Sequence, residues 1–157
     1  MYTKILIFVL CLTVSGTFAQ PDDRIDLGSL RTGATVSFVR HADSDWGIKI
    51  SGGQAPFIIQ QMPVQMEVLA ENDSIHTFST GYDTIQQTTS DLNAYAEIIC
   101  NTNLVFHVLD RWTINDSILT VSRKVDVVGN ASGGFNSSIV LTIDPAVSWV
   151  DVNYLAP

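Results

Sequence analysis

The feature that most constrains this chain is a two-residue alternation of apolar and polar side chains, which recurs in nearly every segment after residue 33. In 118–128, Leu119, Val121, Val125 and Val127 fall on one face of an extended chain, and most of the residues between them are polar. A period of two is that of a β-strand with one face in a core and the other in water. The same alternation marks residues 45–50, 64–68 and 135–144. We therefore expect an all-β protein.

Clusters of Gly, Asn, Asp and Pro separate these runs at intervals of roughly 8–15 residues, which is the rhythm of a β-sandwich. The tetrapeptide Asn-Asp-Ser-Ile occurs at 72–75 and again at 115–118. Asn and Asp tolerate a left-handed backbone, so each copy is predicted to close a hairpin, with the isoleucine starting the return strand. A calcium loop would need more oxygen ligands. The prediction is a two-layer antiparallel β-sandwich over 33–157, preceded by an extended segment at 20–32; a single helical turn is considered only at 90–96.

The first 19 residues have the form of a secretory signal peptide. Lys4 is their only charged residue, an apolar stretch covers 5–14, and Thr17-Phe18-Ala19 is a suitable cleavage site. The apolar stretch is too short to cross a bilayer, which excludes a membrane-spanning anchor at this end. We expect cleavage after Ala19 and a secreted or periplasmic protein.

The charge of the chain narrows the classes of partner. Its formal net charge is −8 at pH 7, which argues against nucleic acid and anionic membrane surfaces. Cys11 would leave with the signal peptide, so Cys100 would be alone and no internal disulfide could form. We expect Cys100 to act as a small buried hydrophobic residue.

The stretch 40–46 carries the densest set of reactive side chains, with Arg40, His41, Asp43 and Trp46 on what should be a hairpin loop. One interpretation is a polar turn with the indole in the core. Another is a loop that meets a sugar or a neighbouring domain. A third makes the cation, the base and the carboxylate an enzyme's reaction centre. No third ligand stands at the spacing of a metal site, and nucleophile-elbow, phosphate-loop and dinucleotide motifs are absent from the sequence. The sequence therefore predicts no catalytic residue, metal or cofactor.

Two further features suggest contact with a ligand or a domain. Tyr82 has a loop context in which an exposed ring could stack against sugar rings. Other aromatic residues could join it in such a platform: Trp46, Trp112, Trp149, Tyr95 and Tyr154. Trp112 and Trp149, in contrast, are expected to pack in the core or at a sheet edge. The apolar run 54–63 is bracketed by prolines and contains Gln60 and Gln61. Proline keeps such a run out of a central strand, so it is either a crossover beneath a second sheet or an interface strip.

Several of the runs resemble, as a set, one known kind of domain. They are 36–40, 46–48, 106–112, 117–129, 134–139 and 149–152. Together they resemble the N-terminal β-sandwich, or supersandwich, that precedes an (α/α)6-barrel catalytic domain in secreted bacterial glycoside hydrolases. The triplets Asp73-Ser74-Ile75, Asp83-Thr84-Ile85 and Asp116-Ser117-Ile118 are similar to O-glycosylation sites of exported Bacteroidota proteins.

The resemblance implies a non-catalytic domain, because the general acid and base of such enzymes belong to the helical barrel. Its partner would be that barrel, and the loop at 40–46 and the residues Gln60 and Gln61 would be candidates for the contact with barrel or substrate. The leading hypothesis is thus an exported accessory domain of a carbohydrate-active enzyme, with polysaccharide as a further partner. The alternative is a free-standing carbohydrate-binding or adhesion module.

Overall fold

The computed structural model describes residues 23–40, 44–53, 58–70, 74–89, 91–116, 118–131 and 133–142. These residues form antiparallel β-sheets and contain no helix, which confirms the all-β prediction. Consequently the described part holds no helix that could cross a membrane.

The strands form three sheets, which we call A, B and C. Sheet A has the order β1-β2-β3-β4, with β1 at Asp23–Ser29, β2 at Thr35–Arg40, β3 at Trp46–Ser51 and β4 at Ile58–Gln60. Sheet B has the order β11-β5-β6, with β11 at Phe135–Ile139, β5 at Val64–Leu69 and β6 at Ile75–Thr80. Sheet C has the order β10-β9-β8-β7, with β10 at Ile118–Gly129, β9 at Leu104–Asn115, β8 at Asp91–Asn101 and β7 at Thr84–Gln87.

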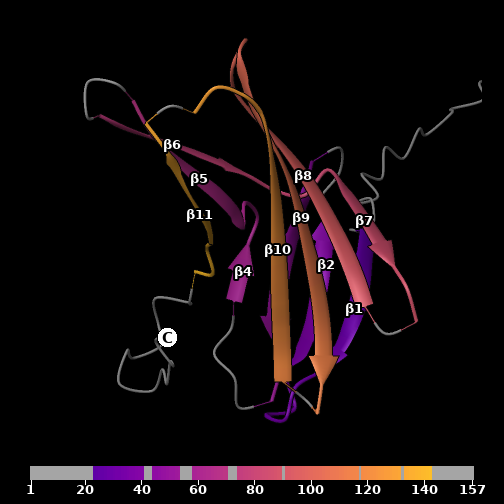
Figure 1. The fold of residues 1–157 in the computed structure, drawn as a ribbon. Coiled ribbons are helices and arrows are strands. Elements are labelled where there is room, and N and C mark those ends of the chain that lie inside the picture. The colour runs from indigo at the N-terminus through magenta and orange to yellow at the C-terminus, as the bar shows by residue number, and fades with distance from the viewer. Residues whose placement is uncertain are drawn as a thin grey trace, which may run out of the picture.

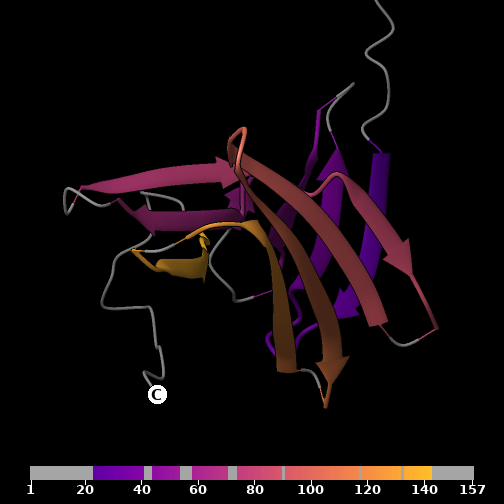
Figure 2. The same cartoon turned by 45° about the horizontal axis from the view of Figure 1, so that its top comes forward.

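Sheets A and B together face sheet C across one core (Figure 1). Sheet B is turned relative to sheet A, and its far end reaches beyond the sandwich (Figure 2). The buried core takes Phe38, Trp46 and Ile48 from sheet A, and Val64 and Met66 from sheet B. Sheet C contributes the inward positions of β8 and β9: Leu92, Ala94, Ala96, Ile98, Leu104, Phe106, Val108 and Trp112. The alternation along each strand therefore decides which side chains enter the core.

The hairpin between β9 and β10 confirms the predicted role of the second Asn-Asp-Ser-Ile copy. Strand β9 ends at Asn115, β10 begins at Ile118, and Asp116 between them has φ 48°. A carboxylate residue accepts this left-handed conformation more readily than most. In the first copy, Ile75 begins β6 as predicted, while 72 and 73 lie outside the described residues.

Three expectations about element boundaries need correction or refinement. Residues 91–96 belong to strand β8 and form no helical turn, because their alternate side chains complete the core. Strand β1 lies within the expected N-terminal segment 20–32 and pairs with β2, so the sandwich begins before residue 33. The proline-bracketed run contributes β4, a short edge strand of sheet A, as its prolines require.

Candidate interaction surfaces

The structure brings together most of the candidate residues at the seam between sheets A and B. Arg40, at the end of β2, stands opposite Trp46, the first residue of β3. The backbone of Trp46 in turn exchanges two hydrogen bonds with Tyr82: each N–H donates to the other residue's carbonyl, at N···O distances of 2.8 and 2.9 Å. Because Tyr82 follows β6, this bridge joins the two sheets. His41 and Asp43 lie outside the described residues.

The aromatic side chains at this seam are part of the core. Tyr82 is fully buried, Trp46 is nearly so, and Trp112 is buried as predicted. Tyr82 and Trp112 both pack around Phe38, with ring centroids 6.0 and 5.7 Å from its centroid. The expectation of an exposed Tyr82 ring that stacks on sugar is therefore wrong, and the interpretation of Trp46 as a core residue is confirmed. Trp149 and Tyr154 lie outside the described residues.

Tyr82 begins a buried polar network that links all three sheets. Its hydroxyl donates to Asp110 Oδ2 over 2.6 Å. Arg123 donates to both carboxylate oxygens of Asp110, from Nε to Oδ1 at 2.7 Å and from Nη2 to Oδ2 at 2.6 Å. Arg123 Nη1 also donates to the hydroxyl of Ser137 at 3.0 Å and the carbonyl of Ser138 at 2.6 Å, both in β11. The network thus connects β9 and β10 of sheet C to the seam and to sheet B.

Burial determines the proton affinities within this network. Removal of Tyr82 from water, together with the neighbouring Asp110 carboxylate, raises the pKa of the phenol far above its ordinary value. Burial by itself would lower the pKa of Arg123, but its hydrogen bonds to Asp110 and the carboxylate charge outweigh this and raise it. The phenol therefore stays neutral and the guanidinium charged, so these groups hold the sandwich together and offer no general base.

Asp110 is a buried acid, although acidic residues usually lie on loops and strand ends where water solvates them. It lies in the middle of β9 and its exposed fraction is 0%. The sequence did contain the signal, since Asp110 shares the inward parity of Phe106, Val108 and Trp112. A charged residue at an inward-facing position of a strand needs an opposite charge beside it. Arg123 occupies the inward-facing position directly opposite Asp110 on β10.

Gln60 and Gln61 lie on an exposed surface formed by residues 59–62 and 141–142, which we call the Gln60 strip. Its hydrophobic side chains are open to solvent: Ile59 is 46% exposed, Met62 52% and Leu141 38%. The β11–β5 pairing continues past its last pair through a bond from Val140 N to Pro63 O, which places Leu141 beside Met62.

The Gln60 amide and two glycines hold this strip against the seam. Gln60 Nε2 donates to the carbonyl of Met62 at 3.0 Å, and its Oε1 accepts from the hydroxyl of Thr142 at 3.0 Å. A Cβ atom on Gly47 would lie 2.5 Å from the Gln60 carbonyl oxygen, and one on Gly81 would lie 2.9 Å from that of Gln61. Only glycine permits so close an approach of two backbones. The backbone of the strip is therefore held in place, and the Gln60 side chain makes its hydrogen bonds within the strip.

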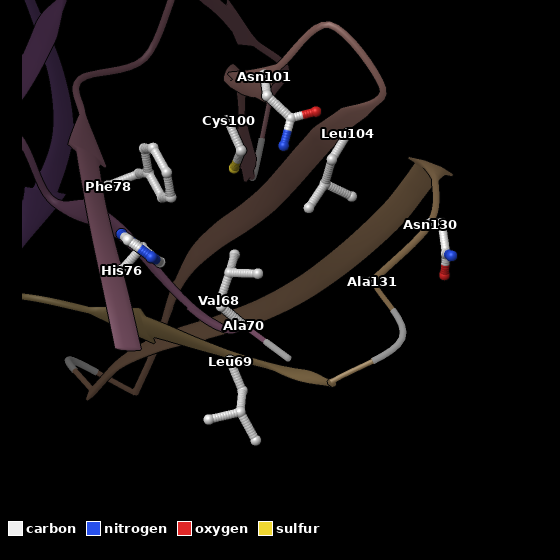
Figure 3. Close-up of a pocket in the computed structure, with 10 residues that line it drawn as sticks. All are labelled: Val68, Leu69, Ala70, His76, Phe78, Cys100, Asn101, Leu104, Asn130 and Ala131. Atoms are coloured by element: carbon white, nitrogen blue, oxygen red, sulfur yellow. The ribbon is translucent and has the colours of Figure 1, made fainter. Parts of the chain in front are cut away.

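A cleft of about 370 Å³ with a mixed polar and apolar lining lies at the opposite end of sheet B. Val68 and Phe78 line it from sheet B, and Cys100 and Leu104 line it from the β8–β9 hairpin (Figure 3). The thiol of Cys100 points into the same space as the Phe78 ring. Burial raises the pKa of this thiol, which disfavours the thiolate, and Cys100 is half-buried, less than the sequence suggested.

The outer face of sheet C carries polar residues that the sequence reasoning missed as a group. Tyr95, Glu97, His107, Arg111 and Lys124 share this face through the strand pairings. They are far apart in sequence, and alternation alone cannot show which strands are neighbours.

Comparison of the chain with protein-family models, with curated proteins and with solved structures gives no match. Within the described ranges, no group of three or more His, Cys, Asp or Glu side chains is placed to hold a metal ion.

Proposed function

We propose that this chain is a non-catalytic N-terminal β-sandwich domain of an exported carbohydrate-active enzyme, a glycoside hydrolase, and that it packs on a helical-barrel catalytic domain outside the chain. The observation that carries the proposal is the Gln60 strip. Ile59, Met62 and Leu141 are large exposed apolar side chains on a strip whose backbone is fixed by glycine contacts and amide hydrogen bonds. The register of the adjoining strands places Leu141 beside Met62. Fixed apolar surface of this kind is typical of a docking site.

The chemistry of the interior also supports a structural role. Asp110 and Arg123 satisfy one another, and Tyr82 donates its only hydroxyl proton to the same carboxylate. The hydrogen bonds of these groups are thus made to one another and link the sheets. The strand patterns that resemble the supersandwich of secreted bacterial glycoside hydrolases supply the identity of the partner, because in those enzymes the reaction takes place in the barrel.

The test uses the product of the reading frame that continues past codon 157, compared with the chain that ends there. Hydrogen–deuterium exchange should show stronger protection of 58–62 and 139–142 in the longer product. The variant Met62→Asp should remove that protection and separate the two domains in limited proteolysis. Ile118→Asp, at an exposed position that begins β10, is the matched control and should have no effect.

Three outcomes would contradict the proposal. The first is a stop at codon 157 followed by an unrelated gene. The second is protection that Met62→Asp leaves unchanged. The third is turnover of chromogenic glycosides by this chain that His41→Ala abolishes, which would make it an enzyme. Tight binding of polysaccharide by the chain together with the first outcome would favour the free-standing carbohydrate-binding module.

A further inference from the structure

The outer face of sheet C presents an ordered array of polar side chains across four paired strands. The cross-strand partners stand in three adjacent rows, which are Gln86–Asn93–Arg111–Ser122, Thr84–Tyr95–Leu109–Lys124 and Glu97–His107–Asp126. Same-face residues along a strand are about 6.8 Å apart, and neighbouring strands about 4.8 Å apart, so the array measures about 14 Å in each direction. No bulge interrupts it, since the only register shift between β8 and β9 lies beyond it, at Ile99–Asn101.

The arginine and the lysine on this face are each paired with a carboxylate within the plane of the sheet. Arg111 donates from Nε to Asp91 Oδ2 at 3.0 Å, and Lys124 Nζ donates to Asp126 Oδ2 at 2.7 Å. His107 Nδ1 lies 3.8 Å from Glu97 Oε2. Such a surface offers many donors and acceptors, and its arginine and lysine are both paired. Glu97 and Asp83, which line one hollow of this face, leave it with an excess of negative charge. It therefore complements a neutral ligand rich in hydroxyl groups better than a polyanion.

The middle row supplies an apolar centre between the polar rows. Tyr95 and Leu109 are half-buried and directly opposite one another on β8 and β9. A hollow of about 310 Å³ lies on the His107 side of Leu109 and includes Tyr95 in its lining. A second hollow, of about 480 Å³, lies on the Arg111 side. An aromatic ring and a leucine side chain flanked by hydrogen-bonding groups match the C–H face and hydroxyl rim of a sugar ring.

We infer that the outer face of sheet C binds a neutral, hydroxyl-rich glycan chain, with Tyr95 and Leu109 beneath a sugar ring and Arg111, His107 and Lys124 bonded to its hydroxyls. The array is long enough for about two or three linked rings. This role goes beyond docking through the Gln60 strip, and it rests on the proposed carbohydrate-related function only for the choice of probe. In such a domain it would hold the polysaccharide near the partner's reaction centre.

The test is a titration of the ¹⁵N-labelled chain, in its exported form, with neutral hexasaccharides: cellohexaose, xylohexaose, mannohexaose and laminarihexaose. At least one should shift the amide resonances of Tyr95, Leu109 and Arg111 with increasing ligand concentration. Arg111→Ala should weaken binding about ten- to hundredfold, because it deletes a charged hydrogen-bond donor. Arg24→Ala is the matched control, since Arg24 forms an exposed pair with Asp26 on the outer face of sheet A, and it should leave binding unchanged.

Tyr95→Leu tests the aromatic contribution with a variant that keeps an apolar side chain at this position, and it should also weaken binding. The inference is overturned if no neutral hexasaccharide shifts resonances on this face, if only hexagalacturonate does, or if Arg111→Ala and Tyr95→Leu bind as the unmodified chain does. These results are independent of the Gln60 strip, because Met62→Asp changes docking of the partner domain without touching sheet C. Loss of either activity can thus be told from loss of the other.

Discussion

The substitution Arg123→Met should destabilise this protein far more than the same change at Arg111. Both arginines donate through Nε and Nη2 to an aspartate carboxylate on the neighbouring part of sheet C. They differ in burial: the Arg123 and Asp110 side chains are 12% and 0% exposed, whereas those of Arg111 and Asp91 are 60% and 14% exposed. The comparison therefore isolates the effect of removing a charge partner from a carboxylate that water cannot reach.

The expected magnitudes follow from that difference. Breaking a buried ion pair by removing one partner costs about 3–5 kcal/mol, because it leaves an uncompensated charge in the interior. An exposed pair is worth about 0–1 kcal/mol. Arg123→Met also deletes the bonds to Ser137 and Ser138, which places it in the upper part of its range. With a urea m-value of about 2 kcal/mol per molar, the midpoint of unfolding should fall by about 2 M for Arg123→Met and by less than about 0.5 M for Arg111→Met.

Urea denaturation followed by tryptophan fluorescence measures both changes, since Trp112 lies in the core. If the unpaired carboxylate causes the loss, the double variant Asp110→Leu with Arg123→Met should recover most of it. Equal midpoints for Arg123→Met and Arg111→Met would refute the reasoning. So would a double variant less stable than Arg123→Met alone, because that would assign the loss to packing.

Three other changes test separate features. Because the pKa of Tyr82 is raised in the folded chain, the unfolded chain loses the phenol proton above about pH 10 while the folded chain keeps it. The free energy of unfolding should therefore fall by about 1.4 kcal/mol per pH unit in that range. Urea unfolding measured against pH should show this slope for the unmodified chain, and Tyr82→Phe should lack it. Gly47→Ala would press a methyl group into the Gln60 carbonyl and should cost about 1–3 kcal/mol by thermal or urea unfolding; a neutral result would mean that the strip is not fixed by this contact. Cys100, whose thiol pKa is raised by burial, should react with a disulfide reagent at pH 7 more slowly than free cysteine, and an equal rate would show that the cleft is open to it.

Much of the fold followed from local pattern. Alternation located the strands and their inward faces, as in the buried Trp46, Ile48 and Ile50 of β3. Turn chemistry located the β9–β10 hairpin, where Asp116 takes the left-handed conformation. Both signals depend only on neighbours in sequence, and so a single chain is enough to reveal them. The segment at 91–96 was ambiguous because Ala and Leu suit either element, and only pairing with β7 and β9 makes it a strand.

The buried network and the outer face of sheet C depend on which distant strands are neighbours. Residues that are close in the sequence carry no information about that. Tyr82 has the flanking residues of an exposed loop, yet the bridge to Trp46 draws it into the seam, where its hydroxyl meets Asp110. The grouping of Glu97, His107 and Asp126 on one face likewise requires the neighbour order of β8, β9 and β10.

The interior network and the exposed strip are mechanically connected, which gives the buried charges a role beyond stability. Arg123 bonds to the carbonyl of Ser138 in β11, and two residues further on the backbone of Val140 donates to Pro63. Leu141 follows directly and stands beside Met62. The guanidinium that neutralises Asp110 thus also bonds to Ser138 near the end of β11, three residues before Leu141 of the strip. A hydrophobic residue at 123 could fill the same volume, but it could not hold the Ser138 carbonyl. The ion pair therefore anchors the segment that carries the proposed docking surface, which a purely apolar pair at these two positions would leave unanchored.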